Sequence, residues 1–166
     1  NSLLGCKLTF KCENFQKAGA FKSRGACNTL MNLSQQEKKN GVITHSSGNH
    51  AAALARAASL QNVKAYIVMP ENSSRVKIDA VKYYGGEITF CKPTLEARES
   101  SLEKIKKQTG AIEIHPYNNY RIIAGQATAT LELLQQIEDK LDFILAPVGG
   151  GGLLSGTALC AKYFSK

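Results

Sequence analysis

The sequence lacks any long hydrophobic run. No apolar stretch approaches the roughly 20 residues that a helix needs to cross a bilayer, so no membrane-spanning segment is expected. The stretch "SLLGC" near the start resembles a lipidation box, but no charged and apolar leader precedes it, and no signal peptide is predicted. The first residue is Asn rather than Met, which indicates either a processed start or a piece of a longer protein.

Paired cysteines are also lacking. The five cysteines are odd in number and scattered, and no CxxC pair occurs among Cys6, Cys12, Cys27, Cys91 and Cys160. Such a set predicts neither a disulfide framework nor a zinc site. Unpaired thiols are typical of a reducing compartment, so a cytoplasmic protein is expected.

Positive charge is in excess, with a formal net charge of +8. The basic residues are dispersed through predicted helices such as "LEKIKKQTG" and interleaved with Glu, without an aromatic platform or a nucleic-acid-binding motif. A nucleic-acid partner is therefore not expected. A preference for small anionic ligands explains part of the charge more simply.

Short apolar, β-branched runs alternate with longer helical patterns along the chain. Six runs are predicted as strands, each followed by a helix: residues 7–12, 41–45, 64–70, 87–91, 111–116 and 142–148. This order predicts a largely parallel, helix-covered α/β sheet without a linker or an internal repeat. Spacing alone does not decide whether the strands form one sheet or two. Ligands in such folds gather beyond the carboxyl ends of strands, where the polar and glycine-rich residues of this chain fall.

The first candidate residue is Lys22, in the stretch "QKAGAFKSRGACNTL". Apolar residues at helical spacing begin near Ala20, so Lys22 lies in the first turn of a predicted helix. The positive end of the helix and the nearby Arg24 both disfavour an ammonium, which favours the neutral, nucleophilic amine. We therefore predict a Schiff-base lysine or an anion site, with a solvated surface lysine as the alternative.

The second candidate is the turn "THSSGNHAA" between a predicted strand and an alanine-rich helix. Hydroxyl, amide and backbone N–H groups are concentrated in its residues Ser46, Ser47, Gly48, Asn49 and His50. A helix cap needs only one Ser or Asn, so this many polar and glycine residues favour a binding function over a cap.

The third candidate is the glycine loop in "APVGGGGLLSG". Its residues Gly149, Gly150, Gly151 and Gly152 follow a predicted strand and open a helix, so backbone N–H groups and the helix dipole can point at an anion. No Lys follows at Walker spacing, and the pattern is a poor dinucleotide fingerprint. A phosphate-sized anion is predicted, with a structural loop as the alternative. A lysine nucleophile and a phosphate cradle together suggest pyridoxal phosphate.

Four ordered motifs carry a resemblance to a known family. "KCENFQKAGAFKSRGA", "THSSGNHA", "IAGQATATLE" and "PVGGGGLLSG" resemble, in order and approximate spacing, the fold-type II pyridoxal-phosphate enzymes, most closely the serine racemases and serine/threonine dehydratases. The resemblance covers essentially the whole chain. It implies a three-layer, parallel-sheet α/β fold like that of the tryptophan synthase beta-like enzymes, and pyridoxal 5'-phosphate as the cofactor.

The resemblance also implies roles for individual residues. Lys22 matches the lysine that forms the Schiff base with the cofactor, and Asn49 matches the asparagine at the pyridoxal 3-hydroxyl. The other implied cofactor-binding residues are Phe21, Gly149, Gly150, Gly151, Gly152 and Leu153, and the implied substrate-binding residues are Ser46, Ser47, His50 and Arg98. From sequence alone, a solvated helix arginine is an equal alternative for Arg98.

Ser47 distinguishes branches of the family. The serine racemases resemble this chain in carrying a serine there, on the cofactor face opposite the lysine, whereas many threonine dehydratases carry alanine. The implied function is that of a serine racemase, a serine/threonine dehydratase or both, in which Lys22 removes the α-proton of serine or threonine. Reprotonation from Ser47 gives racemisation, and loss of the β-hydroxyl gives dehydration. Tyr117 departs from the pattern, since its position can hold a cofactor-side asparagine.

The resemblance implies two domains and further chain. Residues 42–117 would form a small domain, with residues 1–41 and 118–166 as parts of a large domain whose remainder is absent. A divalent-cation site in that absent part and a homodimer are implied for the full-length enzyme, and no metal site is expected within this chain. The alternative function is that of a truncated, non-catalytic paralogue that binds a partner, and a nucleotide-binding module is a third choice.

Overall fold

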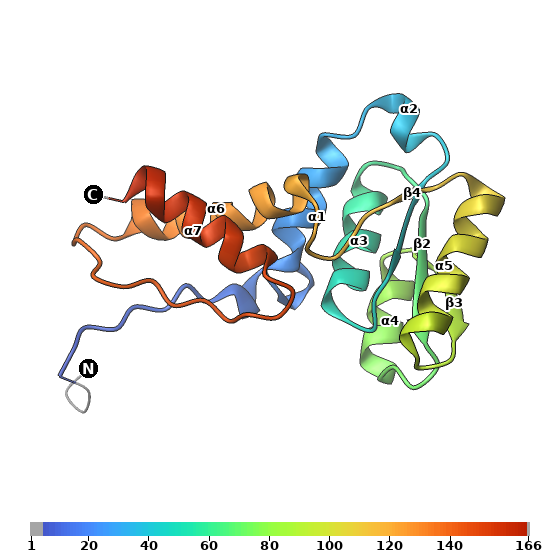
Figure 1. The fold of residues 1–166 in the computed structure, drawn as a ribbon, viewed down its shortest axis with the longest axis horizontal. Helices are drawn as coiled ribbons and strands as arrows, with labels where there is room; N and C mark the ends of the chain where they lie inside the picture. The colour runs from blue at the N-terminus through green and yellow to red at the C-terminus, as the bar shows by residue number, and fades with distance from the viewer. Residues whose placement is uncertain (1–4, 166) are drawn as a thin grey trace.

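The computed structural model describes residues 5–165. Within that range, four parallel strands form one sheet in the order β3-β2-β1-β4 (Figure 1). The strands are β1 Val42–His45, β2 Ala65–Pro70, β3 Glu87–Cys91 and β4 Ile112–Glu113. The chain steps outward from β1 to β3 and then returns to pair β4 with the free side of β1. The predicted parallel α/β fold is confirmed.

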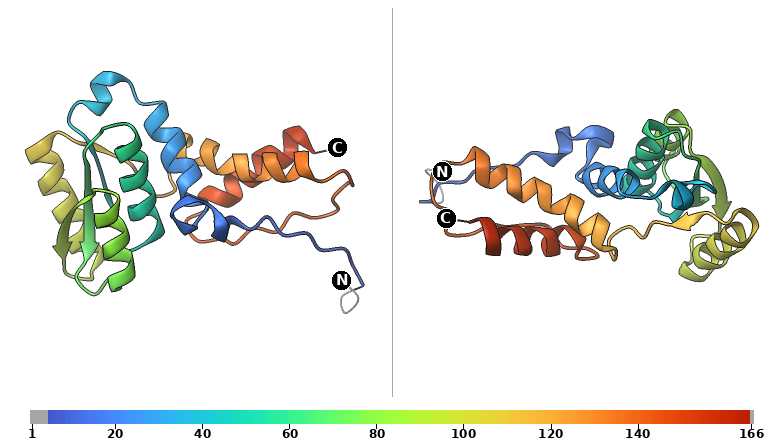
Figure 2. Two further views of the ribbon diagram at one scale, coloured as in Figure 1. Left: turned by 180° about the vertical axis from the view of Figure 1, so that it is seen from behind. Right: turned by 90° about the horizontal axis from the view of Figure 1, so that it is seen from above.

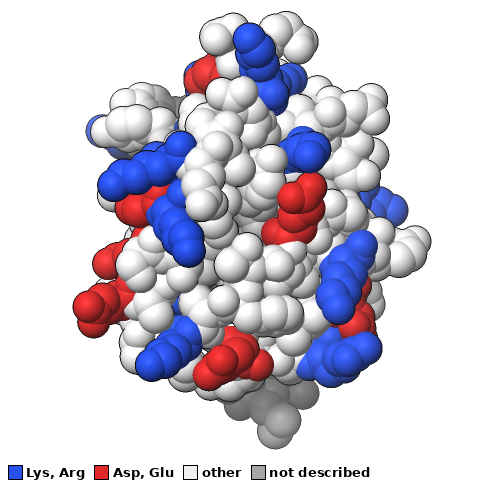
Figure 3. All heavy atoms as spheres, turned by 90° about the vertical axis from the view of Figure 1, so that its right-hand side faces the viewer, with Lys and Arg blue, Asp and Glu red and all other residues white. Residues whose placement is uncertain are grey.

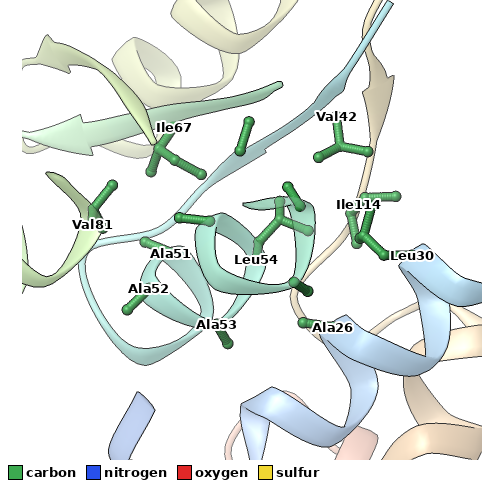
Figure 4. Packing of buried hydrophobic residues seen from close by; sticks show 14 of the residues in the cluster. Ala26, Leu30, Val42, Ala51, Ala52, Ala53, Leu54, Ile67, Val81 and Ile114 are labelled. Atoms are coloured by element: carbon green, nitrogen blue, oxygen red, sulfur yellow. The ribbon is translucent and has the colours of Figure 1, made fainter. Parts of the chain in front are cut away.

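Helices cover both faces of the sheet. α3 (Asn49–Leu60) and α4 (Arg75–Tyr83) pack on one face, and α5 (Leu95–Thr109) packs on the other. Successive residues of β1 point to opposite sides: Val42 joins the larger apolar cluster, shown in Figure 4, and Ile43 joins the smaller cluster beneath α5. The inner strands β1 and β2 are almost entirely buried, as expected for parallel strands covered on both faces, whereas β3 at the sheet edge is mostly exposed.

A second group of helices lies beside this sheet lobe (Figures 1 and 2). It contains α1 (Lys22–Met31), α6 (Tyr120–Gln136) and α7 (Gly152–Phe164). α1 packs against both α3 and α6, and α6 packs along α7. A Cβ on Gly125 would lie only 2.5 Å from the Cα of Gly25, so glycines allow α1 and α6 to approach closely. The short helices are η1 Glu13–Phe15, η2 Lys17–Gly19 and α2 Gln35–Lys38.

Two of the six predicted strands are not formed. Residues 7–12 and 142–148 run as extended chain beside the second helix group and form no β-strand (Figure 1). Neither segment belongs to the four-stranded sheet of the described residues, and a strand forms only where a neighbouring strand pairs with it. The prediction of six strands is therefore wrong for these two, and only the middle four are confirmed.

The outer side of the sheet lobe carries charges of both signs. Figure 3 shows Lys and Arg interspersed with Asp and Glu over this face. Ion pairs account for part of the mixing: the Nζ of Lys106 lies 3.0 Å from Glu103 and 3.1 Å from Glu113. Among the described helices, none is long and apolar enough to cross a membrane.

Candidate active site

The sheet topology places a candidate site beyond the carboxyl ends of β1 and β4. The chain leaves β1 toward β2 on one side, and β4 later joins β1 on the other side. In an open parallel sheet, ligands bind at such a reversal of strand order. Residues 45–49 leave β1 there, and residues 114–117 leave β4.

Lys22 is the first residue of α1 and is partly buried beside the chain that leaves β4. Its Nζ donates a hydrogen bond to the carbonyl oxygen of Pro116 at 2.6 Å and lies 5.3 Å from the centre of the Phe21 ring. Burial lowers the pKa of the Lys22 ammonium below its ordinary value. A lowered pKa increases the fraction of neutral amine, which is the form that attacks a carbonyl carbon.

Arg24 does not act on Lys22 in the predicted way. Its guanidinium pairs with Glu13 at 2.7 Å and with Glu132 at 2.8 Å, and its side chain is only 8% exposed. These two carboxylates compensate its charge, and burial alone accounts for the lowered pKa of Lys22. Arg24 instead ties α1 to α6 and η1, which fixes the start of the helix that carries Lys22.

The turn after β1 is held by backbone groups while two of its side chains stay exposed. The N–H of Ser46 donates to the carbonyl of Val68 at 3.0 Å, and the N–H of Gly48 donates to the Oγ of Ser46 at 3.2 Å. Ser47 and Asn49 are exposed. Gly48 is the N-cap of α3, and no described side chain caps this helix, so its first N–H groups are open to a ligand.

His50 lies inside the protein rather than on the surface of the turn. The residue is 2% exposed, and its Nε2 donates to the carbonyl oxygen of Ile114 at 3.2 Å. Burial is the main cause that lowers the pKa of His50 to about 3, and the charge of Lys22 also lowers it. The neutral ring therefore links α3 to the end of β4, which supports a positioning role. Substrate contact by Ser46 and Ser47 stays a prediction.

Three further residues of this region were not predicted from the sequence as site residues. His115 accepts a hydrogen bond at its Nδ1 from the backbone N–H of Asn118 at 2.9 Å, and burial lowers its pKa. His45 ends β1 and acts electrostatically on His115. From α4, the Nζ of Lys77 comes within 3.2 Å of the position that a Cβ on Gly48 would take. His45 lies within the motif "THSSGNHAA", whereas His115 and Lys77 lie outside the motifs, and only the fold reveals that these two share the site.

The glycine loop opens α7 as predicted. Gly151 has a φ of 86°, in the left-handed region that favours glycine, and is the N-cap of α7. A Cβ on Gly150 would lie 2.2 Å from the Cδ1 of Tyr117, so the aromatic ring packs directly on the loop. A Cβ on Gly149 would meet nothing within 4 Å. The loop is thus open at Gly149 and closed by the ring at Gly150, and no described side chain caps the helix that follows.

The dipeptide after His115 connects the lysine to the glycine loop. Pro116 accepts the hydrogen bond from Lys22, and the next residue, Tyr117, packs on Gly150. The structure therefore brings together two of the three predicted features, separated by more than a hundred residues in the sequence, through one short segment. The third feature, the turn after β1, joins them through the contact of His50 with Ile114.

Two residues predicted to contact the cofactor line the same cavity, whereas one residue predicted to bind the substrate lies elsewhere. Phe21 and Leu153 both line a cavity of about 170 Å³ beside α6. Arg98 lies in α5, on the far face of the sheet, and its Nε donates to the carbonyl of Thr94 at 3.3 Å. No described contact joins Arg98 to the turn after β1, so its role at the substrate stays a prediction.

Comparisons with known proteins agree with this geometry. A family model described as "Pyridoxal-phosphate dependent enzyme" matches residues 1–165. The chain belongs to the pyridoxal-phosphate dependent enzyme family. It is 53% identical to the serine racemase of Dictyostelium discoideum over 162 residues, which make up 98% of this chain and 50% of that protein. The resemblance and the fold predicted from the motifs are therefore confirmed.

Solved structures give the same result. The maize serine racemase matches with a TM-score of 0.95 and 50% identity, over 97% of this chain and 49% of that one. The T.th. threonine deaminase matches with a TM-score of 0.89 and 42% identity, over 97% of this chain and 52% of that one. The chain spans about half the length of the relatives it matches.

The residues present fit pyridoxal phosphate. The loop of residues 149–152 and the uncapped start of α7 offer backbone N–H groups suited to a phosphate. An amine with a lowered pKa, suited to an aldehyde, lies one short segment away at Lys22. Both groups that the cofactor requires are thus in place on neighbouring elements.

Proposed function

We propose that this chain carries the catalytic lysine and phosphate cradle of a pyridoxal-phosphate-dependent serine racemase, serine/threonine dehydratase, or both. One observation carries the proposal. The Nζ of Lys22, whose pKa is lowered, donates a hydrogen bond to the carbonyl oxygen of Pro116, and the next residue, Tyr117, packs on the glycine loop. The identities to a serine racemase and a threonine deaminase support serine and threonine as the substrate class.

The proposed binding residues lie on described elements. Residues 149–152 and the start of α7 would hold the phosphate, and by the resemblance Asn49 would bind the ring hydroxyl and Phe21 and Leu153 would lie near the ring. When bound, pyridoxal phosphate supplies an aldehyde that captures the amino group of the substrate and a ring that accepts electrons. The open N–H groups at the start of α3, together with the Oγ of Ser46, bind the substrate carboxylate.

Two side chains move protons in this proposal. The neutral Nζ of Lys22 removes the α-proton, because burial favours its uncharged form. The Oγ of Ser47, exposed on the turn after β1, returns a proton to the opposite side of the α-carbon, which inverts the configuration. If the β-hydroxyl leaves instead, the products are a keto acid and ammonia. His50 holds the turn in place through Ile114.

Two finer features belong to the whole enzyme. A homodimer is proposed on the resemblance alone. A divalent cation is proposed on the same resemblance, with its site in the part of the relatives that this chain does not match.

Borohydride trapping tests the proposal directly. The chain is incubated with pyridoxal phosphate and reduced, and the modified lysine is mapped by mass spectrometry. We expect one label per chain, at Lys22, because its pKa is lowered by burial. Lys22→Arg should abolish the label, and Lys104→Arg, a change at an exposed helix lysine, should leave it unchanged. Labelling that is absent or spread over exposed lysines would refute the proposal and favour the non-catalytic paralogue.

Ser47→Ala separates the two activities in enzyme that is loaded with pyridoxal phosphate and not reduced. We expect D-serine formation to fall about 100-fold while pyruvate formation persists, because only inversion needs a proton donor on that side. Ser46→Ala is the matched control and should lower both activities together, since the Oγ of Ser46 is assigned to the carboxylate. Equal loss of both activities in Ser47→Ala would remove Ser47 from the proton pathway.

A further inference from the structure

The side chain of His115 holds the segment through which the chain crosses from β4 to α6 (Figure 1). Its Nδ1 accepts hydrogen bonds from the backbone N–H of Tyr117 at 3.3 Å and from that of Asn118 at 2.9 Å. A ring nitrogen that accepts a hydrogen bond carries no proton, so the ring proton lies on Nε2 and the imidazole is neutral. The turn after β4 therefore depends on a side chain that can titrate.

An asparagine makes the same kind of contact a few residues further along the chain. The Oδ1 of Asn119 accepts hydrogen bonds from the N–H groups of Arg121 at 2.8 Å and Ile122 at 3.3 Å, two and three residues on. His115 bonds N–H groups at the same two spacings. Asn, Asp, Ser and Thr ordinarily make such local bonds, and the amide of asparagine does not titrate. A histidine at this position adds a dependence on protonation that an asparagine would lack.

The two residues after His115 carry the contacts that join the site. The carbonyl oxygen of Pro116 accepts the hydrogen bond from the Nζ of Lys22 at 2.6 Å, and the ring of Tyr117 packs on Gly150. The imidazole also lies against that aromatic ring, with the ring centroids 4.5 Å apart and the planes at 88°. His115 thus holds Tyr117 both by its backbone N–H and by its ring. Loss of this hold would free the lysine and the glycine loop together.

We propose that His115 is a positioning residue whose unprotonated Nδ1 fixes Pro116 and Tyr117 in place, and that protonation of the ring releases both. A protonated Nδ1 is a donor and would face two N–H donors, so neither hydrogen bond would form. Lys22 and the glycine loop would then lose their common support. The relevance of this release to a cofactor rests on the proposed function, whereas the hold on the segment does not.

Charged groups from three elements act on the imidazole. Burial is the largest cause and lowers the pKa of His115, Glu113 of β4 raises it, and the charges of His45 in β1 and Lys22 in α1 lower it. The glycine loop adds no ionisable side chain. The balance holds the pKa of the ring below its usual value of about 6.5. The ring is therefore neutral at pH 7 to 8, where the hold is complete, and the hold is lost as the pH falls through that lowered pKa.

Nuclear magnetic resonance on the whole chain tests the hold without any cofactor. The nitrogen shifts of the imidazole show which nitrogen carries the proton and at which pH the ring titrates. Hydrogen exchange at the amide of Asn118, relative to the rate in an unstructured chain, measures the hold itself. The Cε shift of Lys22, followed against pH, gives the pKa of its amine. The variants are His115→Asn, which keeps an acceptor that does not titrate, and His115→Ala, which removes the acceptor.

In the parent, we expect the ring proton on Nε2 above pH 7, and protection at Asn118 that falls by at least about fivefold once the ring is protonated. His115→Asn should keep this protection at every pH, as Asn119 keeps its own pair of N–H groups. His115→Ala should lack it throughout, and the pKa of Lys22 should rise toward its ordinary value because the amine loses its cover. Asn119→Ala is the matched control, which should expose the N–H of Ile122 and leave the pH dependence at Asn118 unchanged.

Borohydride labelling links the hold to the cofactor. At pH 8 the label at Lys22 should form at least about tenfold more slowly in His115→Ala, because a displaced amine no longer faces the glycine loop. His115→Asn should restore the parental rate at that pH. Below the pKa of the ring, His115→Asn should take the label faster than the parent, a difference that a purely structural role would not produce.

Three results would overturn the proposal. The ring could carry its proton on Nδ1 at pH 8, protection at Asn118 could persist while the ring titrates, or His115→Ala could leave the pKa of Lys22 unchanged. If circular dichroism shows that His115→Ala does not fold, the comparison of the parent with His115→Asn below the pKa of the ring decides. A parent that takes no label at Lys22 would refute the proposed function, and the resonance measurements would still decide whether His115 holds the segment.

Discussion

At the scale of single residues, one aromatic ring decides which glycines of the loop can be replaced. The ring of Tyr117 packs on Gly150 and lies edge-on to His115, with ring centroids 4.5 Å apart. In Gly150→Ala the new methyl group would lie 2.2 Å from the Cδ1 of Tyr117, so the ring must move. We expect the free energy of unfolding to fall by about 1–3 kcal/mol, as for other overpacked contacts.

A double-mutant cycle in urea isolates that contact. Tyr117→Ala should remove most of the cost of Gly150→Ala, with a coupling energy of about 1 kcal/mol or more. Gly149→Ala is the matched control, because its Cβ meets nothing within 4 Å, and it should change stability by less than about 0.5 kcal/mol. Strictly additive losses would mean that the ring and the loop do not touch.

At the scale of helices, glycine sets the spacing between α1 and α6. A Cβ on Gly125 would lie 2.6 Å from the carbonyl oxygen of Arg24, and backbone atoms cannot rotate away as a side chain can. Gly125→Ala should therefore push the helices apart and cost more than about 2 kcal/mol, although alanine favours a helix by about 1 kcal/mol. Borohydride labelling of Lys22 should also fall in this variant, because α1 carries that lysine.

The neighbouring residue provides the control for this change. Ala124 is exposed on the same helix, so Ala124→Gly should cost only the propensity difference of about 1 kcal/mol and leave the labelling intact. Both variants are measured by urea unfolding and by labelling at Lys22. If the Gly125→Ala protein is more stable than the parent, the helix propensity of alanine outweighs the close approach of α1 and α6 at this position.

The elements also show how far local sequence patterns reach. The strands of the sheet lobe were predictable because each lies in a short run rich in apolar and β-branched residues that is followed by a helical pattern, and the motifs located Lys22, the turn after β1 and the glycine loop. Residues 142–148 have the same local pattern, yet strand formation requires a neighbouring strand that no local pattern supplies. The effect of Arg24 was misjudged for a similar reason, since its partner Glu132 lies 108 residues away in the sequence.

At the scale of the whole molecule, the candidate site lies where the sheet lobe meets the second helix group (Figure 2). The chain crosses between the two parts after β4, at residues 114–119, and α1 packs on both sides. Lys22, the ring of His50 and the glycine loop all contact this crossing. The junction therefore depends on His50 remaining neutral inside the protein.

The free energy of unfolding should accordingly fall as the pH is lowered from about 7 to about 5. The pKa of His50 is about 3 in the folded protein and about 6.5 in an unfolded chain, so only the unfolded state takes up a proton over this interval. The stabilising contribution is complete above the unfolded pKa and is lost as the pH falls below it. One such group gives a slope of up to about 1.4 kcal/mol per pH unit.

Urea unfolding at successive pH values, compared with His50→Asn, measures this contribution. The variant should be less stable than the parent near pH 7, because it disturbs the link to Ile114, but it should lose about 2 kcal/mol less between pH 7 and pH 5. The lowered pKa of His115 adds a slope of the same sign, so His115→Gln serves as the second comparison. If the pH dependence of His50→Asn equals that of the parent, the buried imidazole does not govern the stability of the junction.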